Sequence, residues 1–184
     1  ARNILTARFL QRDEDYLLFI DSDLEFEPEC VLKMLIAQKD IICTPYRVKT
    51  NDPAITKYTV SIEKPKDVKI FQGGLVEIDN GPAGMMLIKR TVFEKMIKDY
   101  PDKEIKVNPN EGSFPKDMRI YNFWDCNFKD GTWKGEDIYF CDLARKSGFK
   151  IFANIDSTLT HHGGYGYKGK YGDTFKPKSN GKTN

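Results

Sequence analysis

The chain has 184 residues, 40% of them hydrophobic, which is enough for one domain with a sizeable core. Its 29 basic and 27 acidic residues nearly cancel, which argues against a nucleic-acid partner, since such a protein would carry a basic face. Four cysteines without a CxxC pair indicate reduced thiols in a cytoplasmic protein, and no apolar stretch is long enough to span a membrane.

The first part of the chain alternates between helical and strand patterns. Apolar residues at helical spacing from Ile4 to Leu10 predict a helix at the start of the chain, and the apolar run of residues 16–20 predicts a strand buried on both faces. A second helix is expected over 29–38 and a second buried strand over 40–46. This α-β-α-β order predicts an α/β fold with a mostly parallel central sheet flanked by helices.

The later segments add shorter elements. Alternating residues in 57–62 and 68–71 predict a small antiparallel element. A long loop rich in Pro, Asn, Asp and Gly is expected over 101–135, and loops of this length are usually functional or mobile. Further strands and helices are expected over 85–88 (strand), from Thr91 (helix), over 135–149 (helix) and over 150–156 (strand).

Two acidic residues, Asp21 and Asp23, follow directly on the first predicted strand. Ligands of open parallel sheets bind beyond the carboxyl ends of the strands, and carboxylates at i and i+2 on a turn can point into one cleft. Together they would offer hard oxygen ligands to Mg²⁺ or Mn²⁺ bridging phosphates. The alternative is an ordinary Asp-Ser turn with solvated carboxylates.

Two other interpretations of these aspartates can be tested on the sequence. An EF-hand loop is excluded, because its sixth and twelfth positions would be Phe26 and Leu32 instead of Gly and Glu. A phosphatase resembling the haloacid dehalogenases also places D-x-D after a strand. Glu25 stands where that family has Thr or Val, which weakens this interpretation without removing it.

A second acidic pair, Glu136 and Asp137, begins the predicted helix 135–149. Acidic residues in a first helical turn are stabilised by the helix dipole, so a structural role is the simpler interpretation. A carboxylate fixed at a helix start inside a cleft can also act as a general base.

The two histidines of the chain, His161 and His162, are adjacent and are followed by two glycines. A lone histidine is more often structural than functional. Because successive residues of a strand face opposite ways, we expect only one of the two to face a cleft and to serve as a metal ligand.

Five segments resemble, in their order, glycosyltransferases of the GT-A fold that are similar to family 2, and most of all the glycosyltransferase domains of chlorella viruses for capsid glycans. They are "ARN" (1–3), "YLLFIDSDLEFEPECVLKML" (16–35), "GPAGMMLIKRTVFEKM" (81–96), "GEDIYFCDLARKSGFKI" (135–151) and "LTHHGG" (159–164). The family's first strand is missing from this pattern.

The resemblance implies a UDP-sugar donor held by Mn²⁺ or Mg²⁺, transfer of a hexose or deoxyhexose, and a glycan or glycoprotein acceptor. It implies that Asp21, Asp23 and His161 (with His162 as the alternative) hold the metal. Asp137, with Glu136 beside it, would be the catalytic carboxylate. The donor would be bound by residues that include Asp21 and Asp23, together with Arg2, Ser22, Trp133 and Tyr165. Whether the anomeric centre is inverted or retained stays open.

The resemblance also divides the chain. Residues 1–162 would form the glycosyltransferase domain, and residues 163–184 a flexible lid, or a linker to a further domain. If the chain is viral, its location would be the host cytoplasm. A non-catalytic carbohydrate-binding module is a third functional alternative.

Overall fold

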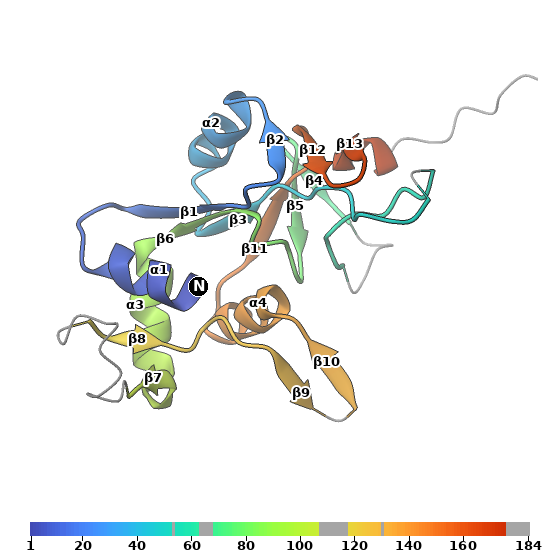
Figure 1. The fold of residues 1–184 in the computed structure, drawn as a ribbon. Coiled ribbons are helices and arrows are strands. Elements are labelled where there is room, and N and C mark those ends of the chain that lie inside the picture. Colours follow the sequence, from blue (N-terminus) through green and yellow to red (C-terminus); the bar gives the residue numbers. More distant parts are fainter. Residues whose placement is uncertain (53, 63–67, 107–117, 130, 176–184) are drawn as a thin grey trace, which may run out of the picture.

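The computed structural model describes residues 1–52, 54–62, 68–106, 118–129 and 131–175. A six-stranded sheet lies at its centre in the order β1-β6-β3-β11-β5-β4 (Figure 1). Its strands are β1 (Tyr16–Ile20), β3 (Ile41–Cys43), β4 (Ile70–Phe71), β5 (Leu75–Ile78), β6 (Met85–Lys89) and β11 (Ile151–Asn154).

The expectation of a mostly parallel central sheet is wrong. Among the described strands of this sheet, β3 and β11 form the one parallel pair, and the pairs β1·β6, β6·β3, β11·β5 and β5·β4 are antiparallel. β1 and β3 do run in the same direction, as a strand-helix-strand unit requires. However, β6 lies between them and hydrogen-bonds to both in the opposite direction. The predicted strand order along the chain could not reveal this insertion.

Helices cover both faces of the sheet (Figure 1). α3 (Arg90–Asp99) and α4 (Glu136–Lys146) pack on one face, and α1 (Arg2–Leu10) lies on the same side. α2 (Glu29–Ile36) packs on the other. Side chains of β3 alternate between the two layers, since Ile41 and Cys43 join the core with α3 and α4 while Ile42 joins the core with α2.

Three small antiparallel sheets surround the centre. β2 (Leu24–Phe26), β12 (Thr158–His162) and β13 (Gly166–Lys170) form one of them. The expected long loop over 101–135 carries the other two, which pair β7 (Glu104–Ile105) with β8 (Ile120–Tyr121) and β9 (Asn127–Lys129) with β10 (Thr132–Lys134). Short 3₁₀ helices cover Pro101–Lys103 and Tyr171–Phe175.

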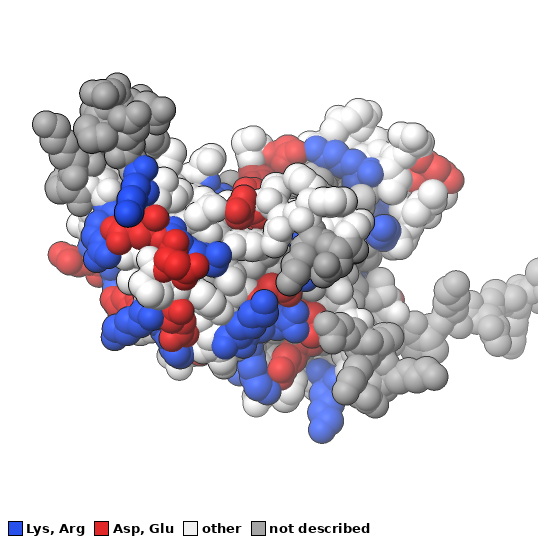
Figure 2. All heavy atoms as spheres, turned by 90° about the horizontal axis from the view of Figure 1, so that it is seen from below, with Lys and Arg blue, Asp and Glu red and all other residues white. Residues whose placement is uncertain are grey.

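The C-terminal segment pairs with the body of the protein as far as the structure describes it, because β13 hydrogen-bonds to β12. Residues 176–184 of the expected lid or linker lie outside the described residues, and the division of the chain at residue 162 stays a prediction. In the described ranges no helix is long and apolar enough to cross a membrane. On the face shown in Figure 2, acidic and basic side chains lie intermixed.

Phe93 is the best test of the core, because it is fully buried on α3 and its ring lies 6.0 Å from Phe9 and 5.9 Å from Phe140 between centroids. We expect Phe93→Ala to lower the free energy of unfolding by about 3–5 kcal/mol in urea titrations. The control Phe128→Ala removes a ring that is 67% exposed on β9 and should change it by about 0.5 kcal/mol or less. Equal losses in the two variants would contradict this packing.

Candidate functional site

The site is built where β1 ends and β6 begins. The N–H of Asp21, the residue after β1, donates to the carbonyl of Gly84 at 2.8 Å, just before β6. The N–H of Thr44, the residue after β3, donates to the carbonyl of Met85 at 2.9 Å. The side chains that follow β1 and β3 therefore meet the turn before β6 at one edge of the sheet.

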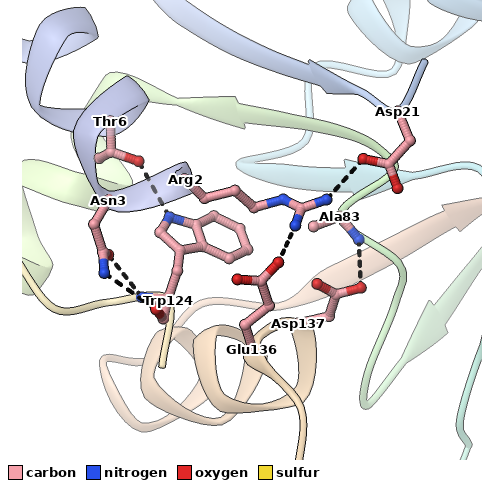
Figure 3. A network of polar contacts seen from close by, with 8 residues as sticks. All are labelled: Arg2, Asn3, Thr6, Asp21, Ala83, Trp124, Glu136 and Asp137. Atoms are coloured by element: carbon pink, nitrogen blue, oxygen red, sulfur yellow. Dashed lines mark hydrogen bonds and ion pairs between the residues drawn. The ribbon is translucent and has the colours of Figure 1, made fainter. Parts of the chain in front are cut away.

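Arg2 on α1 ties this edge to the start of α4 (Figure 3). Its guanidinium donates to Asp21 Oδ1 at 2.8 Å and also to Glu136 Oε1. The guanidinium carbon lies 5.8 Å from the centroid of the Phe19 ring and 6.0 Å from that of Trp124. Aromatic faces and two carboxylates thus hold one cation in a place that water reaches little.

Trp124 and Asn3 fix the position of α1. The indole N–H of Trp124 donates to Thr6 Oγ1 at 3.1 Å, and its backbone N–H donates to Asn3 Oδ1 at 2.9 Å (Figure 3). The indole also stacks on Phe140 of α4 with 4.0 Å between ring centroids. The first turn of α1, and therefore Arg2, is anchored to the core.

Asp137 lies in the first turn of α4 and faces a cavity. Its Oδ2 accepts a hydrogen bond from the N–H of Ala83 at 3.1 Å (Figure 3). Burial raises the pKa of the Asp137 carboxyl, while the Ala83 N–H and the charge of Arg2 act in the opposite direction. The adjacent cavity of about 260 Å³ is lined by Tyr46, Asn80 and Asp137, among others. A half-buried carboxylate with a raised pKa is suited to accept a proton.

Tyr46 closes the site from the end of β3. A Cβ atom at position 84 would lie 2.3 Å from the Tyr46 hydroxyl oxygen and 2.5 Å from Asp21 Oδ2, so these two groups need glycine at that position. The Tyr46 ring also packs edge-on against His161, with 4.8 Å between ring centroids. Burial raises the pKa of the Tyr46 hydroxyl, which therefore stays neutral.

Asp23, in the turn before β2, meets His161 of β12 beside the small sheet β13-β12-β2. Asp23 Oδ2 lies 3.4 Å from His161 Nε2 and 2.6 Å from the Lys49 ammonium. His161 Nδ1 lies 2.8 Å from the carbonyl of Arg47. A carbonyl only accepts, so Nδ1 carries the hydrogen and a neutral His161 turns the lone pair of Nε2 toward Asp23. The hydrogen bond from Lys49 lowers the pKa of the Asp23 carboxyl.

This arrangement fits part of a metal site. The N–H of His161 that faces a carbonyl is the usual support of a metal-binding imidazole. Within the described ranges no three His, Cys, Asp or Glu side chains gather as ligands. Mg²⁺ and Mn²⁺ commonly take one or two protein ligands and complete their shell with phosphates and water. Asp23 and His161 therefore suit a metal shared with a phosphate ligand and do not suit a closed structural site.

The structure brings only some of the predicted residues together. Arg2, Asp21, Glu136 and Asp137 surround one point, and Asp23 meets His161 nearby. Asp21 is paired with Arg2, so the two aspartates face different cations. The other predicted residues lie apart: His162 turns away to Glu25 at 2.7 Å, Ser22 is exposed, and Trp133 and Tyr165 are 64% and 54% exposed. All of these roles stay predictions.

Sequence reasoning missed Tyr46, Lys49, Asn80 and Gly84. Tyr46 follows a buried strand closely, so the strand-end argument that found Asp21 could have found it as well. Lys49 carried no such signal, because an isolated lysine in a polar segment is most often solvated.

Comparisons with known proteins name no family for the chain. No protein-family model matches it, and no curated protein matches it. Among solved structures, it is similar to a crystal structure of A197 from STIV, with 23% identity and a TM-score of 0.49. That match covers 88% of this chain, and this chain spans 65% of the length of that one. A likeness at this level carries no argument about function.

The resemblance to GT-A glycosyltransferases of the family 2 type, and among them to chlorella virus domains, is therefore wrong as a family assignment. The mostly antiparallel central sheet contradicts the expected parallel core, and no family model matches. Any function of the chain therefore rests on the geometry of the site residues.

The raised pKa of Asp137 predicts a pH-dependent change in stability. A carboxyl whose folded pKa lies above its unfolded pKa costs stability when ionised, and this cost disappears as the pH falls below both values. We expect Asp137→Asn to raise the melting temperature at pH 7.5, with a gain that shrinks as the pH is lowered to 3.5. Asp13→Asn, on the surface, should show no such trend. A gain that stays constant with pH, or a loss at pH 7.5, would contradict this account.

Proposed function

We propose that this chain is a metal-dependent glycosyltransferase that moves a hexose or deoxyhexose from a UDP-sugar to a hydroxyl of a glycan or glycoprotein acceptor. The observation that carries the proposal is that two kinds of side chain lie close to the end of β1: a pair suited to bind a cation and a carboxyl suited to accept a proton. Asp23 and His161, whose carboxylate and imidazole suit a cation, lie 3.4 Å apart on one side. A separate carboxyl with a raised pKa, Asp137, lies on the other.

The sugar-nucleotide donor would be bound through positive charges at the site. A sugar nucleotide leaves its sugar as a diphosphate, on which negative charge develops as the bond breaks. Mn²⁺ or Mg²⁺ held by Asp23 and His161 would stabilise that charge. Lys49, whose ammonium contacts Asp23 in this structure, would offer a further positive charge to the diphosphate. Arg2 is engaged by two carboxylates, so we assign it the positioning of Asp21 and Glu136.

The acceptor side uses the cavity next to Asp137. Its walls include Val60, Pro82 and Ile138, which suit the apolar face of a sugar ring. Asn80 also lines this cavity, and its Oδ1 is buried and has no hydrogen-bond partner among the described residues. A hydroxyl of the acceptor would donate to it and relieve that unpaired state. An acceptor bound there would present a second hydroxyl to Asp137.

The reaction then balances simply. The acceptor oxygen forms a new bond to the anomeric carbon, the bond from that carbon to the diphosphate breaks, and Asp137 takes the acceptor proton. General-base catalysis of this kind contributes typically about 10²–10⁴ in rate. A single displacement assisted by Asp137 inverts the anomeric centre.

Two exposed aromatic side chains are proposed to contact the ligands. Trp133 is paired across the β9–β10 hairpin with Phe128, and both are exposed two or more residues before α4 begins. An aromatic face of this kind can stack on a sugar ring. Tyr165 packs edge-on against Tyr167, with 5.3 Å between ring centroids, close along the chain to His161.

The donor and its metal are tested together by thermal shift with UDP, GDP, CMP and UDP-sugars, each with and without Mn²⁺. UDP at about 100 times its dissociation constant should add about 2.7 kcal/mol of stability, and only with Mn²⁺. We expect Asp23→Ala to abolish this shift. The control Glu25→Ala removes a carboxylate two residues away that faces His162, and it should retain the shift. Equal shifts in wild type and Asp23→Ala would refute the metal assignment.

The chemistry is tested by transfer assays on Asp137→Asn. We expect the variant to keep the UDP-plus-Mn²⁺ shift and to lose about 10²–10⁴ in kcat, because an amide cannot take the proton. Asp142→Asn, on the same helix but paired with Lys134 and Arg145, serves as the control and should keep near-normal turnover. Normal turnover in Asp137→Asn would show that Asp137 is not the general base and has a structural role only.

The alternatives give different results with the wild-type protein. Hydrolysis of a phosphomonoester with Mn²⁺ and no response to UDP would establish a phosphatase. Binding of sugars without transfer or hydrolysis of any UDP-sugar would establish a carbohydrate-binding module. Either result would overturn the proposed function.

A further inference from the structure

We infer that Asp23 and His161 form a site for a single cation, and that the ammonium of Lys49 is the chain's own occupant of that site, which a divalent metal must displace. The inference rests on the metal site of the proposed function and adds a residue to it. Lys49 would thereby set how tightly the metal binds before the nucleotide arrives.

The contacts of Asp23 lead to this conclusion. The same oxygen, Oδ2, lies 2.6 Å from Lys49 Nζ and 3.4 Å from His161 Nε2. Nδ1 of His161 is held by the carbonyl of Arg47 at 2.8 Å, which leaves Nε2 as the atom turned toward Asp23. A carboxylate oxygen and an imidazole nitrogen so placed are ligands for a cation, and the ammonium is the cation that the chain supplies.

The path of the Lys49 side chain is also specific. Its stem crosses the backbone of Gly163, where a Cβ atom would lie 3.1 Å from Lys49 Cδ and 3.4 Å from Cε. Gly163 follows the two histidines directly, so the stem passes beside the strand that carries His161. The side chain of Lys49 is 38% exposed, so its ammonium can move into water without being pulled from a buried place.

A metal ion and this ammonium exclude each other. Mg²⁺ binds oxygen at about 2.0–2.1 Å, and a second positive charge on the same carboxylate oxygen would be repelled. Lys49 therefore lowers the affinity for the free ion. A diphosphate that arrives with the metal offers the displaced ammonium a new anionic partner within reach of its flexible stem. Lys49 thus couples metal binding to nucleotide binding, and coupling of this kind is reciprocal.

The test is a titration of Mn²⁺ without nucleotide, followed by the electron paramagnetic resonance signal of the free ion. Lys49→Met keeps the length of the stem and removes its charge, and it should bind Mn²⁺ about five- to tenfold more tightly than wild type. Lys49→Arg should stay near wild type. The matched control Lys150→Met removes a lysine that pairs with Glu77 at 2.8 Å on another part of the surface, and it should change nothing. Melting curves establish that each variant is folded.

The second readout is the effect of UDP on the Mn²⁺ affinity. UDP should strengthen it by a larger factor in wild type than in Lys49→Met, because the variant has no ammonium to displace. Unchanged or weaker Mn²⁺ binding in folded Lys49→Met, or no Mn²⁺ binding in either protein, overturns the inference. A gain in Lys49→Met from a protein that transfers no sugar supports the inference and overturns the proposed function. Sugar transfer by a protein whose Lys49→Met variant binds Mn²⁺ no more tightly supports the proposed function and overturns the inference.

Discussion

The pairing of β2 with β12, together with the turn that carries Asp23, places His161 and not His162 against Asp23. Leu24 lies opposite His161, and the N–H of His162 donates to the carbonyl of Asp23 at 2.8 Å. Because side chains alternate along a strand, the two histidines point to opposite faces of β12. His162 contacts Glu25 of β2, and His161 contacts Asp23, which lies in the turn before β2. A slip of one residue would turn each histidine to the opposite face and separate His161 from Asp23. The backbone hydrogen bonds of a three-stranded sheet at the side of the molecule therefore set the geometry of the site.

Arg2 binds two of the carboxylates at the site and leaves the others to different partners. Asp21 and Glu136 both bind its guanidinium, and the rings of Phe19 and Trp124 lie beside it. One positive charge thereby offsets the repulsion that the acidic residues brought together at the end of β1 and the start of α4 would otherwise feel. In the proposed function, Asp23 would bind a second cation, and Asp137, whose pKa burial raises, would take the acceptor proton. The proposed function would therefore separate metal binding from proton transfer, since Asp21 pairs with Arg2 and Asp23 faces Lys49 and His161 instead.

Local patterns in the sequence were enough to find much of this molecule. The helical spacing in residues 4–10 and 29–38 predicted α1 and α2, and the apolar run after Asp15 predicted β1. The strand-end argument brought Asp21 into the site, and the alternation argument allowed one histidine to face it. The insertion of β6 between β1 and β3 could not be predicted in this way, because strand pairing is a long-range choice that the period of a strand does not encode. Lys49 was missed for the same reason, since its contact with Asp23 spans 26 residues.

The most direct test of the central claim is electron spin echo spectroscopy of Mn²⁺ bound together with UDP. If Asp23 and His161 share the metal, the spectrum should show coupling to an imidazole nitrogen. That coupling should disappear in His161→Gln and persist in His162→Gln, because His161 lies against Asp23 while His162 contacts Glu25. A spectrum without nitrogen coupling, or one whose coupling is lost in His162→Gln and kept in His161→Gln, would contradict the account.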